Sequence, residues 1–372
     1  MSEATPPSSE VSPATHLDAA APIREGERLD DATLAKLEAW LRERAPLRNT
    51  SGDLEVLQFR AGYSNLTYLL RLGERELVLR RPPYGAKIKS GHDMSREYNV
   101  LSKLAPAWPK APAPLAYCED AELLGAPFYV MERLQGIILR RSLPKGLAYD
   151  EAGARALSES LIDGLAELHG LDYAAAGLAE LGRPEGYVSR QVEGWTARYH
   201  KAKTDEHAPL EAAMEWLARS MPAEAGATLI HNDYKYDNVV LDPGEPTRII
   251  GVLDWEMCTL GDPLMDLGTT LGYWVEAGDD PRARMMAFGP TQIPGSLTRA
   301  ELVARYAEKT GREIEDPVFY YVFGLFKIAV IIQQIYARYK KGLTKDPRFA
   351  PLGHFVGLLG EVAAARIDDG KL

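Results

Sequence analysis

The sequence has few cysteines and no hydrophobic run of membrane-spanning length. Its two cysteines, Cys118 and Cys258, lie far apart in the chain. They suggest neither a metal-ligand cluster nor a redox pair, and they fit a reducing cytosol. The longest apolar stretch, Val318 to Ile332, is interrupted by Lys327 and falls short of the roughly 20 residues that cross a bilayer. We therefore expect a buried helix there and no membrane partner.

Basic residues are also in the minority. The first 23 residues contain no Lys or Arg and no apolar run, so we do not expect a secretory or transit peptide. Across 372 residues, 43 Lys and Arg stand against 53 Asp and Glu, which gives a net charge of −10. That balance argues against a general affinity for nucleic acid. We expect a cytoplasmic protein, and the oligomeric state stays open.

Several common catalytic signatures are missing. The chain has no G-x-x-x-x-G-K-[ST] phosphate loop, no G-x-S-x-G nucleophile elbow and no Cys/His spacing typical of zinc. These absences argue against P-loop NTPases, α/β-hydrolases and zinc proteins.

The distribution of residues along the chain predicts two unequal lobes. Residues 1–24 are rich in Pro, Ser and Ala, and we expect a mobile tail. A strand-rich lobe follows over residues 25–132, with Asp30 or Asp31 and later Asp93 as helix N-caps. Its expected strands are Leu54–Phe59, Thr67–Leu72, Glu76–Arg81, Leu115–Cys118 and Phe128–Arg133.

Residues 133–372 are dominated by helical periodicity. Leucines recur at three- and four-residue spacing over Glu151–Gly170, and Gln191–Arg219 and Arg299–Lys341 look largely helical. A strand-rich segment followed by a helical one predicts an α+β protein with a cleft between its lobes.

The densest polar motif runs from His231 to Asn238, between two short apolar segments. It has the spacing H-x-D-x-x-x-x-N, as in the kinase catalytic loop. A second apolar segment ends at Asp254, in the sequence Asp-Trp-Glu. Phosphoryl transfer uses one carboxylate to orient a hydroxyl, and an amide oxygen with another carboxylate to hold Mg²⁺. We assign these roles to Asp233, Asn238 and Asp254.

These motifs resemble the aminoglycoside phosphotransferase and choline kinase superfamily. The similarity is greatest to the phosphotransferase branch that is also found fused to acyl-CoA dehydrogenases, and it covers the chain from about residue 30 onward. The motifs that carry it are Ser64-Asn65-Leu66-Thr67, Arg80-Arg81-Pro82-Pro83, Arg96-Glu97-Tyr98, His231–Asn238, Asp254-Trp255-Glu256 and Gly261-Asp262-Pro263.

The resemblance implies a two-lobed, protein-kinase-like fold and an ATP- and Mg²⁺-dependent kinase that acts on a small molecule. Arg80 would hold the nucleotide phosphates and pair with Glu97, with a surface Arg and a surface Glu as the alternative. The loop with Gly62, Ser64 and Asn65 would cover the phosphates, although the same residues could form an ordinary hairpin turn.

The adenine site is expected at the junction of the lobes. Val78 and Met131 would supply apolar packing, and the backbone of Met131, Glu132 and Arg133 would meet the adenine edge. A methionine at this position could equally be plain core.

Four polar residues near Asp233 and Asp254 have less certain roles. We place His231 and Lys235 with the catalytic residues, although His231 is expected to shape the loop rather than transfer protons. Lys235 could reach the transferred phosphate or be an exposed loop lysine. Glu256 is either a metal ligand or a carboxylate that orders the loop. Asp266 is expected to cap the next helix and brace the loop.

The acceptor is predicted to be a small molecule with a hydroxyl group, such as a hydroxylated acyl-CoA. An anionic acceptor would suit a basic cluster near the C-terminus, which could also be a solvated helix end. This cluster consists of Arg338, Lys340, Lys341, Lys345 and Arg348. The alternatives are an aminoglycoside kinase and a catalytically silent nucleotide-binding module.

Overall fold

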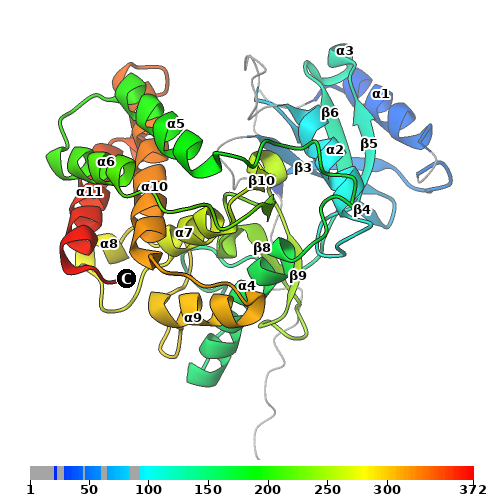
Figure 1. Cartoon of the computed structure of the whole chain (residues 1–372). Helices are drawn as coiled ribbons and strands as arrows, with labels where there is room; N and C mark the ends of the chain where they lie inside the picture. Colours follow the sequence, from blue (N-terminus) through cyan, green and yellow to red (C-terminus); the bar gives the residue numbers. More distant parts are fainter. Residues whose placement is uncertain (1–20, 23–28, 45–46, 60–64, 84–92) are drawn as a thin grey trace, which may run out of the picture.

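The computed structural model describes residues 21–22, 29–44, 47–59, 65–83 and 93–372. A smaller strand-rich lobe lies beside a larger helical lobe (Figure 1). This arrangement confirms the predicted α+β class with two unequal lobes.

The smaller lobe is built on a six-stranded antiparallel sheet with the order β1-β2-β3-β4-β6-β5. Its strands are β1 (Ala21–Pro22), β2 (Leu54–Gln58), β3 (Leu66–Leu72), β4 (Arg75–Arg81), β5 (Pro114–Cys118) and β6 (Phe128–Glu132). The five longer strands agree with the predicted ones to within a residue at either end. In β4, Val78 is aligned with Met131 of β6, so both residues lie at the centre of the sheet.

Within the predicted tail of residues 1–24, the structure describes Ala21 and Pro22. They form β1 and are aligned with Gln58 and Leu57 of β2, because β2 would otherwise offer unpaired backbone groups at the sheet edge. The rest of the predicted tail lies outside the described residues.

Local capping signals determine where the helices of the smaller lobe begin. In α1 (Asp31–Arg42) the Asp30 side chain accepts a hydrogen bond from the backbone N–H of Thr33. In α2 (Met94–Leu104) the Asp93 side chain accepts from the N–H groups of Ser95 and Arg96. Both caps were predicted, and a short helix α3 (Ala121–Leu124) completes the lobe.

The larger lobe contains the remaining helices and two small antiparallel strand pairs. Its helices are α4 (Glu151–His169), α5 (Tyr187–Ala202), α6 (Ala208–Arg219), α7 (Pro263–Tyr273), α8 (Pro281–Arg284), α9 (Arg299–Thr310), α10 (Pro317–Lys340) and α11 (Leu352–Asp369). The strand pairs are β7 (Thr228–Ile230) with β10 (Thr259–Gly261), and β8 (Val239–Leu241) with β9 (Ile249–Val252). Two of the predicted helical stretches are each divided in two, and α6 and α10 restart with a proline in the first turn.

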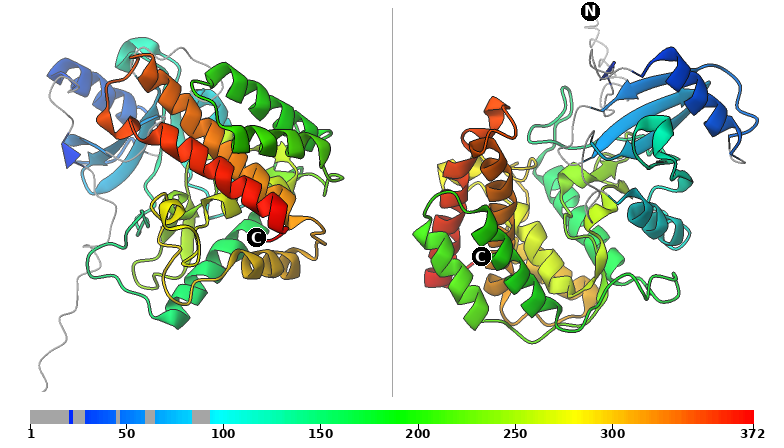
Figure 2. Two further views of the ribbon diagram at one scale, coloured as in Figure 1. Left: turned by 90° about the vertical axis from the view of Figure 1, so that its left-hand side faces the viewer. Right: turned by 90° about the horizontal axis from the view of Figure 1, so that it is seen from above.

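Helix α10 contains the longest apolar stretch and is the central helix of the larger lobe. It is long and apolar enough to cross a membrane by length and composition, but 83% of its most hydrophobic window is buried inside the protein. Its neighbours include α11, which lies beside it in both views of Figure 2, and α7. Gly268 and Gly324 let α7 and α10 approach closely, because a Cβ on either would overlap backbone atoms of the other helix. The predicted buried helix is confirmed.

The apolar core has two parts. One cluster fills the space between α1 and one face of the sheet, and it includes Leu41, Tyr68 and Phe128. The other cluster includes Val78 and Met131 and continues through α2 into the helices of the larger lobe. The second cluster therefore joins the two lobes, whereas the first belongs to the smaller lobe alone.

Candidate active site

The predicted catalytic loop connects β7 to β8 and places Asp233 at the surface of the larger lobe. The Asp233 side chain is 18% exposed. Its Oδ2 accepts a hydrogen bond of 2.7 Å from Nδ2 of Asn238 and an ion-pair hydrogen bond from Nζ of Lys235. The spacing H-x-D-x-x-x-x-N therefore brings its Asp and Asn into direct contact.

A third donor reaches Asp233 from a distant part of the chain. The hydroxyl of Tyr273, the last residue of α7, donates to Oδ1 of Asp233 over 2.7 Å. Burial, together with the nearby Asp233 carboxylate, raises the pKa of Tyr273 well above its usual value. Tyr273 is therefore a hydrogen-bond donor throughout the physiological range. Our sequence analysis missed this residue, since no spacing motif connects it to the loop.

The contacts of His231 are with backbone groups of the loop, which indicates a structural role rather than proton transfer. It is fully buried, its Nδ1 accepts from the N–H of Asp233, and its Nε2–H donates to the carbonyl of Leu253 over 2.8 Å. Burial lowers the pKa of His231, so the ring is neutral near pH 7. Of its two suggested roles, the structure supports the shaping of the loop, and His231 does not touch the Asp233 carboxylate.

Asp266 braces the same loop, but it does not cap a helix. The N-cap of α7 is Asp262, whereas Asp266 lies in the first turn and is completely buried. Its oxygens accept from the N–H groups of His231 and Asn232, each over 2.7 Å, and its Oδ2 also accepts from His169. The predicted capping role is wrong because the helix begins earlier than we expected.

Arg80, on β4 of the smaller lobe, connects the two lobes. Its guanidinium donates to Glu97 over 2.5 Å and to Asp254 over 2.8 Å. The predicted Arg80–Glu97 ion pair is therefore present and buried, and the alternative of two surface residues is wrong. Burial opposes the charge on Asp254, but the guanidinium of Arg80 holds the pKa of this carboxyl below its ordinary value. Asp254 is ionised at neutral pH.

Glu256 belongs to the same cluster as Arg80. Its Oε2 accepts from Nδ2 of Asn65 over 2.7 Å and lies 3.8 Å from Arg80. The backbone carbonyl of Glu256 accepts from Arg96. These contacts favour the loop-ordering role over direct metal binding. Asn65 bonds this carboxylate, while the predicted phosphate-covering residues Gly62 and Ser64 lie outside the described residues.

The predicted adenine site is only partly available. Val78 and Met131 are buried and face the shared core. The N–H of Glu132 donates to the carbonyl of Ala113, so it is not free to meet a base. Arg133 is held by an ion pair with Glu76.

The donor chemistry of Asn238 and Asp254 fits a Mg²⁺ site. Nδ2 of Asn238 is committed to Asp233, which leaves the amide oxygen for a cation. The N–H of Leu253 donates to the carbonyl of Asn238 over 2.8 Å, which keeps the two ligands adjacent. No group of three His, Cys, Asp or Glu side chains suited to a metal occurs in the described ranges. Mg²⁺ commonly binds one or two protein ligands and completes its shell with water and substrate phosphates.

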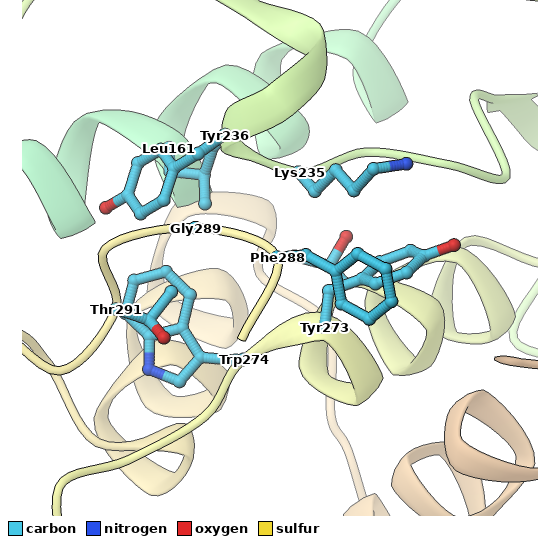
Figure 3. Close-up of a pocket in the computed structure, with 9 residues that line it drawn as sticks. Leu161, Lys235, Tyr236, Tyr273, Trp274, Phe288, Gly289 and Thr291 are labelled. Atoms are coloured by element: carbon cyan, nitrogen blue, oxygen red, sulfur yellow. The ribbon is translucent and has the colours of Figure 1, made fainter. Parts of the chain in front are cut away.

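A small pocket is lined in part by Lys235 and Tyr273 (Figure 3), the same two residues that bond the Asp233 carboxylate. It has an empty volume of about 230 Å³, part of it open to solvent, and aromatic rings dominate its lining. Nζ of Lys235 lies 4.6 Å from the ring centre of Tyr273, and Phe288 packs edge-on against that ring at 4.9 Å. Of the lining residues, only Lys235 is charged. The full lining is Leu161, Lys235, Tyr236, Thr270, Tyr273, Trp274, Phe288, Gly289 and Thr291.

The chain is similar to several known proteins. A family model described as the phosphotransferase enzyme family matches residues 55–302. Mouse acyl-CoA dehydrogenase family member 10 is 33% identical over 317 residues, which cover 85% of this chain and 29% of that protein. Human acyl-CoA dehydrogenase family member 11 is 34% identical over 292 residues, covering 78% of this chain and 37% of that protein. The chain thus spans about a third of the length of these relatives.

Solved structures share the whole architecture. A Ralstonia eutropha protein, provisionally named an aminoglycoside phosphotransferase, is 32% identical with a TM-score of 0.76, covering 92% of this chain and 99% of that chain. A spectinomycin phosphotransferase, solved with ADP and spectinomycin, is 14% identical with a TM-score of 0.57, covering 89% and 98% of the two chains. These similarities confirm the predicted kinase-like fold.

Proposed function

The chain belongs to the phosphotransferase enzyme family, and on this premise we propose that it transfers the γ-phosphate of ATP to a hydroxyl group of a small molecule, with Mg²⁺. The observation that carries the proposal is the arrangement of Asp233 beside Asn238 and Lys235, opposite Asp254 and Arg80. Phosphoryl transfer needs these groups: a carboxylate for the acceptor, a metal site and cations for the phosphates.

Each residue of the site has a separate role in the proposed reaction. Asp233 accepts a hydrogen bond from the acceptor hydroxyl and takes its proton as the oxygen–phosphorus bond forms and ADP leaves. Lys235 and Arg80 stabilise negative charge on the phosphates. Asn238 and Asp254 would hold Mg²⁺, which supplies charge neutralisation between the phosphate oxygens when it is bound.

Two observations bear on the acceptor. The pocket beside Asp233 is aromatic, and Lys235 is the one charged residue of its lining. This lining favours an uncharged carbon chain next to the hydroxyl, as in a hydroxylated acyl-CoA. The names of the acyl-CoA dehydrogenase relatives point to the same metabolism, but they describe much longer proteins.

The C-terminal basic cluster adds no support to an anionic acceptor. Lys340 pairs with Asp205 and Arg348 with Asp346, so two of its five cations already have carboxylate partners. We keep an aminoglycoside as the second candidate, because the Ralstonia protein named for that activity is 32% identical. Retention of Asp233, Asn238 and Asp254 argues against a silent binding module.

A cytoplasmic location is part of the proposal. It rests on Cys118 and Cys258, which are both free thiols, as expected in a reducing compartment.

The test is a screen for acceptor-stimulated release of ADP from Mg-ATP. Hydroxylated acyl-CoAs, choline-like amines and aminoglycosides would be compared, with Asp233→Asn protein as the blank. We expect hydroxylated acyl-CoAs to stimulate release only with the wild-type protein. Stimulation by aminoglycosides alone would select the second candidate, and equal release by both proteins would reject the assigned base.

A further inference from the structure

Helix α10 carries a buried lysine directly behind the catalytic loop. Lys327 is 1% exposed and interrupts the apolar stretch from Val318 to Ile332 of this helix. Its Nζ donates to the backbone carbonyl of Asn232 over 2.8 Å, to Oδ1 of Asn232 over 3.1 Å and to Oγ1 of Thr269 over 3.3 Å. A protonated amine has three N–H groups, so each donor of Lys327 has one acceptor.

The residue that Lys327 holds has an unusual backbone conformation. Asn232 has φ of +68°, in the left-handed region that costs most residues energy, although asparagine tolerates it better than most. Its N–H donates to Asp266, and its side-chain amide donates to the carbonyl of Met257. With Lys327 on the two oxygens of Asn232, the polar groups of this residue are all occupied.

No carboxylate neutralises Lys327 directly. Within the described ranges it forms no ion pair, and the charged groups that act on it most strongly come from three elements. They are Asp266 of α7, Asp233 and Lys235 of the loop, and Arg198 of α5. The ring of Trp195, also on α5, lies 5.8 Å from Nζ. Burying an unpaired charge is costly, and this cost has no purpose in a helix that only needs to fill the core.

We infer that Lys327 is a positioning residue, which fixes the strained Asn232 and thereby the direction of the neighbouring Asp233 carboxylate. The inference rests on the proposed function only for its effect on turnover. Its effect on the order of the loop is independent of any activity. Geometry errors of about 1 Å in a catalytic group can cost on the order of 100-fold in rate, so the fixation of one peptide unit beside the base matters.

The same contacts make the position sensitive to pH. Burial, partly offset by Asp266 and Asp233, lowers the pKa of Lys327 to about 8. A neutral amine has two N–H groups and one lone pair. When Lys327 loses its proton, one of its three acceptors therefore loses its donor. Relief of the buried charge outweighs this lost hydrogen bond. An opening of the loop that exposes Lys327 to water restores its ordinary pKa and takes up a proton, so we expect such openings to become rarer as the pH rises through this value.

The test compares Lys327→Met with a matched variant of the same helix. Gln333→Met also removes a buried polar group, whose amide donates to Ala202 and Thr204, but it does not touch the loop. Amide hydrogen exchange of residues 229–241 should accelerate in Lys327→Met and stay unchanged in Gln333→Met. The kcat of Lys327→Met should fall by on the order of 10- to 100-fold with the KM for ATP unchanged.

The same substitution can also be tested in a protein that carries Asn232→Gly. Glycine adopts positive φ without strain, so the kcat loss caused by Lys327→Met should be smaller when Asn232→Gly is present. Equal exchange of residues 229–241 in wild-type and Lys327→Met protein would overturn the inference. This holds even if no acceptor is found and the proposed function fails.

If Lys327→Met does not fold, the pH dependence of hydrogen exchange in the wild-type protein tests the inference instead. Exchange protection of residues 229–241, corrected for intrinsic exchange rates, should rise as the pH increases through about 8, because the opened loop binds the additional proton. Protection that stays constant through this range would contradict the inference.

Discussion

The hydroxyl of Tyr273 donates a hydrogen bond of 2.7 Å to Oδ1 of Asp233. Together with Asn238 and Lys235 on Oδ2, it gives the carboxylate three donors. A carboxylate has about four lone-pair sites, so one remains for an acceptor hydroxyl. Tyr273 thus fixes the rotation of the base and defines the direction from which the acceptor can approach.

Replacing Tyr273 with Phe should lower kcat by roughly 10-fold or more, because a hydrogen bond to a charged group contributes about 1.5–3 kcal/mol. The KM for ATP should not change, since Tyr273 faces the acceptor side. Steady-state kinetics with the best acceptor measures both values. Tyr199→Phe, which removes a hydroxyl bonded to Glu211, is the control and should retain wild-type kcat. Equal kcat in Tyr273→Phe and wild type would rule out this role.

The Arg80–Glu97 pair should show strong energetic coupling. Removing one partner of a buried ion pair costs about 3–5 kcal/mol, so Arg80→Met should be strongly destabilised in urea. Adding Glu97→Gln should recover part of the loss, because the uncompensated charge disappears. Arg71→Met, which breaks an exposed pair with Glu55 and a part-buried pair with Glu76, should change stability less. Additive effects of the two substitutions in the cluster would show that the pair is not coupled.

The titration of Lys327 should also appear in global stability. Its folded pKa is about 8 and its ordinary value is 10.5. Between these values the unfolded chain binds more protons, so the free energy of unfolding contributed by this group rises with pH. From pH 8 to 10, wild type should gain about 2 kcal/mol relative to Lys327→Met. Urea unfolding of both proteins across this range measures the gain, and parallel curves would argue against a depressed pKa.

Asp254→Ala should abolish the Mg²⁺ dependence of nucleotide binding, since the carboxylate is the main anionic ligand of the proposed site. Calorimetric titration of ATP with and without MgCl₂ measures this dependence. Glu256→Gln should keep it, because the Glu256 carboxylate is engaged with Asn65. If the Mg²⁺ dependence of ATP binding persists in Asp254→Ala, or disappears in Glu256→Gln, then Glu256 rather than Asp254 is the metal ligand.

The features that could be predicted from the sequence depend on short-range chemistry. Asp30 and Asp93 cap helices through hydrogen bonds within three residues. The contact of Asp233 with Asn238 follows from a fixed spacing within one loop. The strands of the smaller lobe could be located from their flanking turn residues for the same reason.

The features that could not be predicted depend on how distant elements meet. Tyr273 reaches Asp233 because α7 ends beside the catalytic loop, and no pattern in the sequence encodes that distance. Lys327 appeared only as an interruption of an apolar helix, and its contact with Asn232 comes from the packing of α10 against α7. We predicted correctly that Asp266 braces the catalytic loop, but we were wrong that it caps the next helix. Asp262 and Asp266 are both plausible N-cap residues by sequence, and Asp262 is the one that caps α7.

The most direct measurement is the turnover of purified Asp233→Asn protein, with its affinity for Mg-ATP determined in the same preparation. As the proposed general base, Asp233 should contribute roughly 10²- to 10⁴-fold to kcat, while ATP affinity stays at the wild-type value because the residue faces the acceptor. A folded Asp233→Asn protein with wild-type kcat would contradict the assignment of Asp233 as the base for phosphoryl transfer.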